Sequence, residues 1–356
     1  MLKKLLLLIL LFTISRINAQ IPAHYYDNAN GKNGTALQLA LHNIIKGHTA
    51  VSYGQIWTTV QTTDKRPDDG KVWDIYSDIP GGTPPYEFTF VTNQCGSYQH
   101  EGDCYNREHS FPQSWFNKAA PMKSDLFHIY PTDGKVNGMR SSYPYGEVST
   151  PTWTSMNGSK LGPNTTAGYS GTGTAFEPID AYKGDVARSY FYMAVRYYLQ
   201  DNGWKDNEAV HGSQMKPWEL NLLHQWSIQD TVSQKEINRN NAIYGIQHNR
   251  NPFIDHPEWI DSIWFNTTSI KKINQFFMVN IYPNPANNKV NIKLGSFNTH
   301  TFVIAIYDLS GRKLQEVQSS NLISTLDLST ISKGIYIIKV NSTDGELSKT
   351  LKLIKK

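Results

Sequence analysis

Residues 103–116, DCYNREHSFPQSWF, and residues 124–147, SDLFHIYPTDGKVNGMRSSYPYGE, hold the densest polar chemistry in the chain. Glu108 and His109 are adjacent, so on a regular strand their side chains would face opposite ways. Pro112 follows three residues later and favours an end to the strand. If the strand ends or bends there, the carboxylate and the imidazole can meet at one site.

The second stretch supplies carboxylate, imidazole, amide and guanidinium groups within sixteen residues: Asp125, His128, Asp133, Asn137 and Arg140. Carboxylate and amide oxygens suit Mg²⁺ or Ca²⁺, and a lone imidazole suits a base. This combination is typical of metal-assisted hydrolysis of a phosphodiester. In that reaction a base deprotonates water, a hard cation stabilises the developing charge, and an arginine can clamp a phosphate.

Composition excludes several classes of protein. The 356 residues are 39% hydrophobic and 18% charged, as in a globular chain. Because the only long apolar run lies at the N-terminus, the chain is not a multi-span membrane protein. Two cysteines are too few for a four-cysteine zinc module or a disulfide-dense miniprotein.

The net charge of +4 hides an asymmetry along the chain. Residues 1–19 hold three of the 34 Lys and Arg and none of the 30 Asp and Glu. Residues 270–356 hold 12 of the Lys and Arg and five of the Asp and Glu. Residues 20–269 therefore hold 19 basic and 25 acidic groups, a balance of −6. Binding of a polyanion by this part cannot rest on bulk charge.

The N-terminus, MLKKLLLLILLFTISRINAQ, has the layout of a secretory signal peptide, with cleavage expected after Ala19. Its apolar stretch is too short for a membrane anchor, and no transmembrane anchor is expected in the mature chain. After export, Cys95 and Cys104 can form a disulfide, although two free thiols remain possible.

Periodicity predicts an amphipathic helix over residues 37–48 and a second helix after Asp185, which we expect to act as its N-cap. Residues 149–174 are rich in Ser, Thr, Gly and Asn and predict a hairpin or an exposed loop. From residue 280 onward, about seven short alternating runs separated by turn signals predict a small β-sandwich.

The C-terminal segment carries a first resemblance. YPNP, YDLSGRKL, KGIYIIKV and a basic last strand, within residues 278–356, resemble the C-terminal sorting domain of the type IX secretion system of Bacteroidetes. The resemblance implies the type IX machinery as a partner, passage across the outer membrane, and release or surface attachment. A generic carbohydrate-binding or adhesion sandwich is the alternative.

A second resemblance covers most of residues 37–264. NREHSFPQSWF, DLFHIYPTDGKVNGMRSSYPYGE, residues 182–198 and residues 239–264 together resemble the bacterial endonuclease I family. It implies a catalytic domain that carries a ββα-metal finger. Taken with the N-terminal pattern and the first resemblance, the chain is expected to be α+β, with a signal peptide (1–19), a mainly helical catalytic domain (20–269) and the β-sandwich sorting domain (270–356).

The family resemblance also implies roles for individual residues. His109 matches the general base, with one ring nitrogen held by a carbonyl. Glu108 and Asn137 match the ligands of a divalent cation, Mg²⁺ or else Ca²⁺ or Mn²⁺. Arg140 is a candidate catalytic residue that either holds the finger or contacts phosphate. A Cys95–Cys104 bridge would restrain the strand that delivers Glu108 and His109.

Other assignments are open between a functional and a structural role. His128 either contacts phosphate or packs beneath the finger, and Arg250 is a candidate phosphate contact in a Pro-ordered loop. Asp125 is expected to cap a turn or to form hydrogen bonds within the loop, and Asp133 either approaches the metal or makes a turn before Gly134. Arg107 is a further candidate for contact with the substrate phosphate. A basic face is expected from six cations: Arg107, Lys135, Arg140, Arg188, Arg196 and Arg250.

The leading interpretation is an exported, metal-dependent, non-specific endonuclease that cuts DNA and RNA through contacts to phosphates. The family resemblance implies that it leaves 5′-phosphate ends. One alternative is a non-catalytic surface-binding protein on a decayed nuclease scaffold. Another is an extracellular phosphodiesterase for small substrates. A monomer is expected, but no sequence pattern encodes the oligomeric state.

Overall fold

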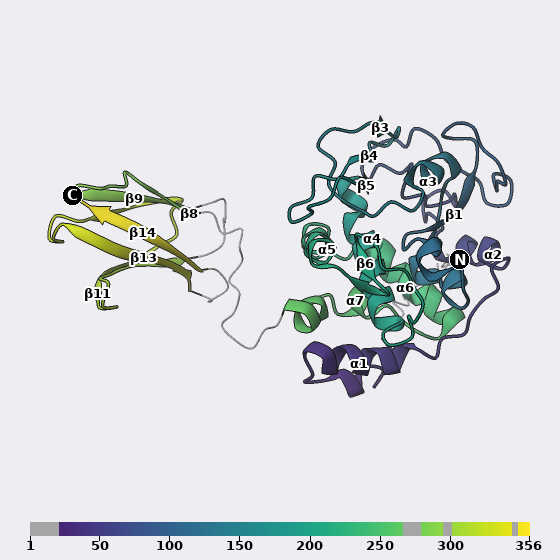
Figure 1. The fold of residues 1–356 in the computed structure, drawn as a ribbon, viewed down its shortest axis with the longest axis horizontal. Coiled ribbons are helices and arrows are strands. Elements are labelled where there is room, and N and C mark those ends of the chain that lie inside the picture. Colours follow the sequence, from purple (N-terminus) through teal and green to yellow (C-terminus); the bar gives the residue numbers. More distant parts are fainter. Residues whose placement is uncertain (1–20, 266–278, 295–300, 344–347) are drawn as a thin grey trace, which may run out of the picture. The chain divides into compact units, whose positions relative to one another are not determined.

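The computed structural model describes residues 21–265, 279–294, 301–343 and 348–356. It divides into two compact units, Met1–Asn266 and Thr267–Lys356, here called the N-terminal and C-terminal domains (Figure 1). The predicted signal peptide and the predicted boundary at residues 269 and 270 lie outside the described residues. In the described part of the chain, no helix is both long enough and apolar enough to span a membrane.

Two short strands and a helix carry the polar residues of the motif. Strand β1 (Tyr105–His109) pairs antiparallel with β2 (Ile129–Asp133), and helix α3 (Gly134–Arg140) follows β2 directly. Asp133 is the N-cap of α3, because its Oδ1 accepts a hydrogen bond of 2.8 Å from the Val136 amide. Of the two roles considered for Asp133, the structure therefore shows the local turn role, as a helix cap.

Helix α4 (Lys183–Arg196) is the centre of the N-terminal domain, and all 14 of its residues are buried. It packs against α1 (Gly34–Ile45), α5 (Pro217–Gln229) and α7 (Pro252–Asp255). The prediction that Asp185 caps this helix is wrong. The helix begins two residues earlier, and the Asp185 carboxylate lies in its first turn, 2.8 Å from the Lys235 ammonium.

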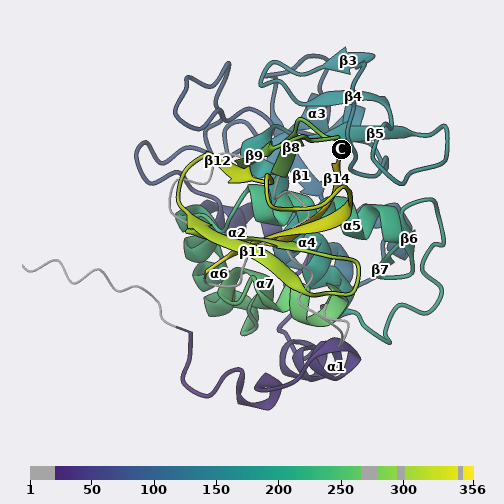
Figure 2. The same ribbon diagram turned by 90° about the vertical axis from the view of Figure 1, so that its left-hand side faces the viewer.

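The remaining elements surround this centre. Residues 149–174, predicted as a hairpin or loop, contribute to a three-stranded sheet of β3 (Trp153–Thr154), β4 (Lys160–Pro163) and β5 (Thr174–Glu177), which Figure 2 shows at the upper right. The other elements are α2 (Ile56–Thr63), α6 (Gln234–Gln247), and the hairpin of β6 (Val210–His211) and β7 (Gln214–Met215). The domain is thus mixed helix and strand, with a predominantly helical centre.

The described part of the C-terminal domain consists of strands and their connections. One sheet has the order β11-β10-β13-β14 and the other β12-β9-β8. Residues of both sheets, such as Ile292 and Ile338, belong to one buried cluster. The strands are β8 (Val279–Tyr282), β9 (Lys289–Leu294), β10 (Phe302–Tyr307), β11 (Lys313–Ser319), β12 (Ile323–Asp327), β13 (Gly334–Ser342) and β14 (Ser348–Lys355).

Candidate active site

A cavity of about 360 Å³ brings together four residues singled out in the sequence, Arg107, Glu108, His109 and Asn137. It is also lined by residues 112–114, Lys118, Gly138 and residues 141–142. His109 is the last residue of β1, so the alternation of side chains stops there. Glu108 and His109 are both still paired with β2, and both line the cavity at this end of the strand.

Glu108 is a buried carboxylate with two partners on one oxygen. Its Oε1 accepts a hydrogen bond of 2.9 Å from the Tyr76 hydroxyl and lies 3.2 Å from Nη1 of Arg140. Burial raises the pKa of Glu108 to about 7, while Arg140 acts in the opposite direction. Because the hydroxyl and the guanidinium both approach Oε1, Oε2 is the oxygen that can serve a ligand.

The His109 ring is held in one tautomer by a backbone carbonyl. Nε2 lies 3.0 Å from the carbonyl oxygen of Lys123, which can only accept, so the proton is on Nε2 and the lone pair on Nδ1. Burial, followed by the neighbouring His128, lowers the pKa of His109 to about 3. The ring is therefore neutral near pH 7, the state that a general base requires.

Arg140 and His128 are buried and do not line the cavity. Arg140 donates from Nη1 to the His109 carbonyl oxygen over 2.8 Å and from Nη2 to the Ser110 carbonyl oxygen over 2.5 Å. His128 bonds through Nε2 to the Met122 carbonyl oxygen at 2.8 Å, and its ring centroid is 5.5 Å from that of His109. Burial lowers the pKa of His128.

Arg107 and Arg250, both candidates for phosphate contact, are in different settings. Arg107 lines the cavity, donates to the Tyr53 carbonyl oxygen over 2.9 Å, and lies 3.8 Å from the Tyr53 ring centroid. Arg250 is 2% exposed and away from the cavity lining. Its guanidinium binds the Asp255 carboxylate through two hydrogen bonds, of 2.6 and 2.7 Å.

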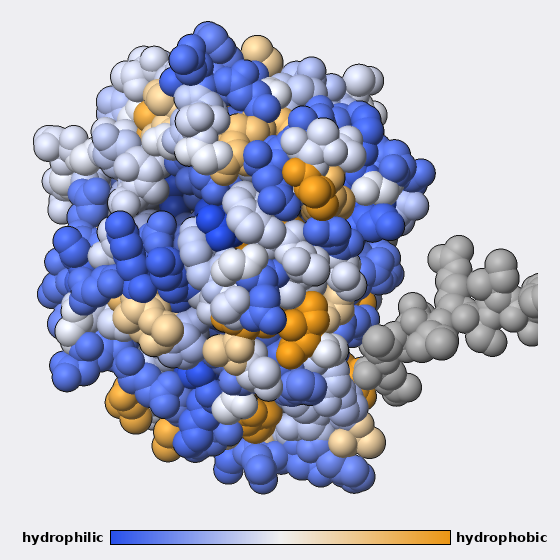
Figure 3. Space-filling model, turned by 90° about the vertical axis from the view of Figure 1, so that its right-hand side faces the viewer, coloured by the Kyte–Doolittle hydropathy of each residue, from blue (hydrophilic) through white to orange (hydrophobic). Residues whose placement is uncertain are grey.

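The prediction that six cations line one basic face is wrong for most of them. Arg188 is bound by the Glu236 carboxylate and Arg196 bonds to His48, and both arginines are buried, as are Arg140 and Arg250. Buried guanidinium groups satisfy neighbouring acceptors instead of facing solvent. Figure 3 shows one face of the N-terminal domain, where hydrophilic residues predominate and apolar residues form small separate groups.

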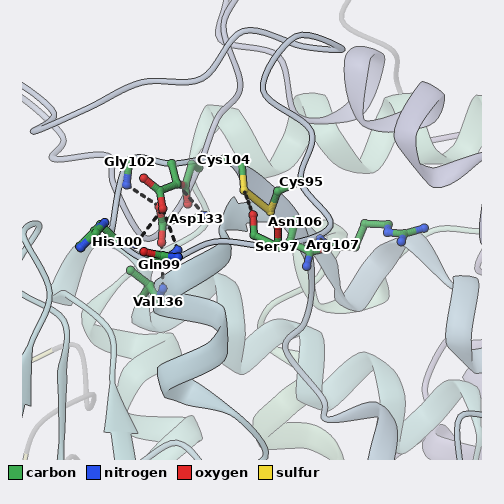
Figure 4. Close-up of a disulfide and its surroundings, with 12 residues drawn as sticks. Cys95, Ser97, Gln99, His100, Gly102, Cys104, Asn106, Arg107, Asp133 and Val136 are labelled. Carbon is green, nitrogen blue, oxygen red and sulfur yellow. Dashed lines mark hydrogen bonds between the residues drawn. A yellow bond between two sulfur atoms is a disulfide. The ribbon is translucent and has the colours of Figure 1, made fainter.

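The predicted disulfide between Cys95 and Cys104 is present and closes a loop next to α3 (Figure 4). The Cys104 carbonyl accepts the Gly134 amide over 2.9 Å, and Asp133 Oδ2 accepts the Gly102 amide over 2.8 Å. Tyr98, inside the loop, occupies the space where a Cβ on Gly134 or Gly138 would lie. The loop is thus fastened to the first turns of the helix that carries Asn137.

Asp125 has the capping role that the sequence predicted. Its side chain accepts from the Phe127 amide over 3.2 Å at the start of the 3-10 turn Leu126–His128. The tyrosine hydroxyls of Tyr192 and Tyr197 each donate to its Oδ2 over 2.8 Å.

Among the described residues, no group of three or more His, Cys, Asp and Glu side chains is arranged to hold a metal ion.

Sequence reasoning missed three contributors to the site. The Lys123 carbonyl orients His109, Tyr53 flanks both Arg107 and His109, and Lys118 lines the cavity. A backbone carbonyl carries no residue signature. The signal for Lys118 was its position within the QSWFNK segment, directly after the motif.

Comparison with known proteins places both domains. The endonuclease I family model matches residues 33–258, and the secretion system C-terminal sorting domain model matches residues 280–356. The chain is 41% identical over 248 residues to an extracellular ribonuclease of Bacillus amyloliquefaciens, covering 67% of this chain and 78% of that protein.

Two further relatives show the same pattern. An extracellular ribonuclease of Bacillus subtilis (strain 168) is 36% identical over 250 residues, covering 67% of this chain and 78% of that protein. Endonuclease-1 of Buchnera aphidicola subsp. Baizongia pistaciae (strain Bp) is 26% identical over 133 residues, covering 37% and 46%.

The chain therefore belongs to the endonuclease I family and carries a type IX secretion sorting domain at its C-terminus. It is a secreted or cell-surface nuclease, a hydrolase that acts on nucleic acid. Both resemblances predicted from sequence motifs are confirmed.

Proposed function

We propose that the protein is a metal-dependent, non-specific endonuclease in which His109 is the general base and Glu108 and Asn137 hold a divalent cation. The observation that carries the proposal is the meeting of these three residues on one cavity, with the His109 ring fixed by the Lys123 carbonyl. In this interpretation β1, β2 and α3 form a ββα-metal finger, and the two C-terminal sheets form a β-sandwich.

The chemistry of the donors fits a hard cation. Glu108 offers the carboxylate oxygen Oε2, and Asn137 offers an amide oxygen from α3. Mg²⁺ prefers oxygen ligands and keeps several waters, so two protein ligands leave positions for the substrate phosphate. When bound, Mg²⁺, Ca²⁺ or Mn²⁺ would neutralise charge that develops on the phosphate and on the leaving oxygen.

The proton-transfer step follows from the His109 tautomer. Nδ1 carries the lone pair and takes a proton from the attacking water. As the ring becomes cationic, its Nε2–H remains bonded to the Lys123 carbonyl, which stabilises the charged imidazole and prevents the ring from turning. The resulting hydroxide attacks phosphorus and the P–O3′ bond breaks. The departing 3′ oxygen takes a proton from water, so the product ends are a 5′-phosphate and a 3′-hydroxyl.

The arginines divide into two roles in this proposal. Arg107 binds a substrate phosphate, because it lines the cavity and no carboxylate pairs with it among the described residues. Arg140, already bonded to the His109 and Ser110 carbonyls, is a positioning residue. His128 and Arg250 support the fold around the site, since both are buried and paired elsewhere.

The substrate is proposed to be both DNA and RNA. Two relatives are named as ribonucleases and a third as an endonuclease, which supports action on either polymer. The cavity lining presents cations and hydroxyls suited to phosphate, which every nucleotide carries. Binding to phosphates gives little preference for sequence.

The test uses the purified protein with its disulfide formed. We expect nicking of supercoiled plasmid and cleavage of single-stranded RNA with Mg²⁺, and no cleavage with excess EDTA or by the folded His109→Ala variant. Cleavage that continues in EDTA would contradict metal dependence. Full activity of His109→Ala would exclude His109 as the base, and cuts confined to one short sequence would exclude non-specific action.

A binding measurement tests the cation site separately from catalysis. Titration calorimetry with Mn²⁺ should show one site in the wild type and much weaker binding in Glu108→Gln and in Asn137→Ala. Unchanged binding in both variants would place the cation elsewhere. Asn238→Ala, an exposed amide on α6, is the matched control and should bind as the wild type does.

A further inference from the structure

Part of the cavity is formed by residues that have no role in the chemistry proposed above. Ser114 lies in the 3-10 turn Gln113–Phe116, Lys118 follows that turn, and Ser142 follows the end of α3. The hydroxyls of Ser114 and Ser142 are hydrogen-bonded over 2.8 Å, which joins the two segments. A lysine and two serines thus line the same cavity as Glu108 and His109.

Lys118 has no ion-pair partner among the described residues. Its side chain is exposed, and among the residues that the structure describes no carboxylate lies within ion-pair distance of it. Lysines elsewhere in the domain, such as Lys183 and Lys216, have carboxylates at 2.7 Å. An ammonium on a cavity lining with no internal counter-charge is available to an anion from outside.

The backbone that carries Lys118 is held in an unusual conformation. Asn117 and Lys118 have φ of 57° and 55°, in the left-handed region that residues other than glycine adopt rarely. Asn117 donates from its side-chain amide to the Gly203 carbonyl over 2.9 Å, and the Lys118 amide bonds to the Gln113 carbonyl over 2.8 Å. These bonds fix the loop before any ligand arrives, and backbone strain of this kind concentrates at binding sites.

The size of the cavity allows more than one phosphate. About 360 Å³ lies within the range of pockets that enclose whole small molecules, whereas one phosphate needs only a fraction of it. A nucleic acid strand brings a phosphate at every nucleotide, so a strand cut at one phosphate must place another nearby. Ammonium and hydroxyl groups are suitable donors for this second phosphate.

We propose that Lys118, with Ser114 and Ser142, forms a subsite for a phosphate that flanks the cleaved one on the same strand. The inference rests on the proposed function, because it assumes that cleavage occurs at the end of the cavity with His109. The subsite makes the enzyme favour polynucleotides over substrates with a single phosphodiester. It also places the specificity for polymers in a loop outside the catalytic motif.

The experiment compares two substrates in Mg²⁺: a dinucleoside monophosphate, which has no flanking phosphate, and an octanucleotide. The variants are Lys118→Ala, Lys118→Arg, which keeps the charge, and Lys32→Ala, which removes an exposed lysine away from the cavity lining. For Lys118→Ala we expect KM for the octanucleotide to rise about tenfold with kcat little changed, as for loss of one charged hydrogen bond. The slope of the logarithm of the binding constant against the logarithm of the salt concentration should become smaller by about one.

The remaining arms decide between outcomes. Lys118→Arg and Lys32→Ala should keep the wild-type KM, and the dinucleoside should be cut equally by all variants or by none of them. An unchanged octanucleotide KM in Lys118→Ala overturns the subsite. An equal loss of kcat on both substrates also overturns it, because Lys118 would then contact the cleaved phosphate. A wild type that cuts neither of the two substrates would contradict the proposed function itself.

Discussion

The buried guanidinium of Arg140 donates a hydrogen bond to the backbone carbonyl of His109, with 2.8 Å between Nη1 and the oxygen. This bond joins the last residue of α3 to the last residue of β1. Since α3 carries Asn137 and β1 carries Glu108, it fixes the distance between the two proposed metal ligands. The ion pair with Glu108 at 3.2 Å reinforces the same connection.

Replacing Arg140 by Met should lower the free energy of unfolding by about 3–5 kcal/mol, because the buried Glu108 carboxylate loses its only cationic partner among the described residues. Urea unfolding monitored by tryptophan fluorescence measures the change. A variant as stable as the wild type, with only a raised KM, would instead indicate that Arg140 contacts substrate phosphate.

Replacing Gly138 by Ala should destabilise the protein by about 1–3 kcal/mol and reduce activity, because the added methyl group overlaps the Tyr98 ring against α3. Adding Tyr98→Ala should restore part of the loss, which a double-mutant cycle would measure. Gly245→Ala is the matched helical control, since beyond its chain neighbours and the nearby backbone of its own helix no described atom lies within 4 Å of its Cβ position. That control should stabilise slightly; a loss as large as that of Gly138→Ala would remove the steric explanation.

The stability of the protein should fall as the pH drops below about 6.5, the ordinary pKa of histidine. Burial lowers the pKa of His128, so the folded protein keeps this ring neutral while the unfolded chain takes up a proton. In the His128→Gln variant, the slope of the unfolding free energy against pH should be smaller by up to about 1.4 kcal/mol per pH unit, which corresponds to one proton. Parallel curves of unfolding free energy between pH 7 and 5 would show that His128 is not the group responsible.

Replacing both Cys95 and Cys104 by Ala should lower the free energy of unfolding by about 2–4 kcal/mol, because the unfolded chain is no longer restrained by a closed loop. Thermal unfolding and denaturant unfolding should both show that the double variant is less stable than the oxidised wild type. Dithiothreitol should destabilise the wild type and leave the double variant unchanged. Equal stability of oxidised wild type and variant would argue that the loop is held by its hydrogen bonds alone.

The sequence predicted the features that arise from neighbouring residues. Pro112 indicated that the strand ends near His109, and Asp133 before Gly134 indicated a local turn role, which the structure shows as a helix cap. The disulfide followed from export and from the short spacing of the two cysteines. Each of these inferences needs only a few residues of chain.

Features that depend on distant contacts could not be predicted in this way. A charged residue type does not indicate whether its partner is solvent or a buried carboxylate 32 positions away, as for Arg140 and Glu108. Arg188 was assigned to a surface for the same reason, although Glu236 binds it in the interior. Lys118 directly follows the motif in the sequence, but the left-handed turn that carries it contains no glycine to mark it.

Helix α4 has no side that faces solvent, and this limits how the sequence can change. Most helices accept substitutions on an outer face, which lets neutral variation accumulate there. In α4 all 14 residues are buried, including the basic residues Lys183 and Arg188. A saturation library over this helix should therefore yield few tolerated variants at any position, and divergence there should require compensating changes in the helices around it.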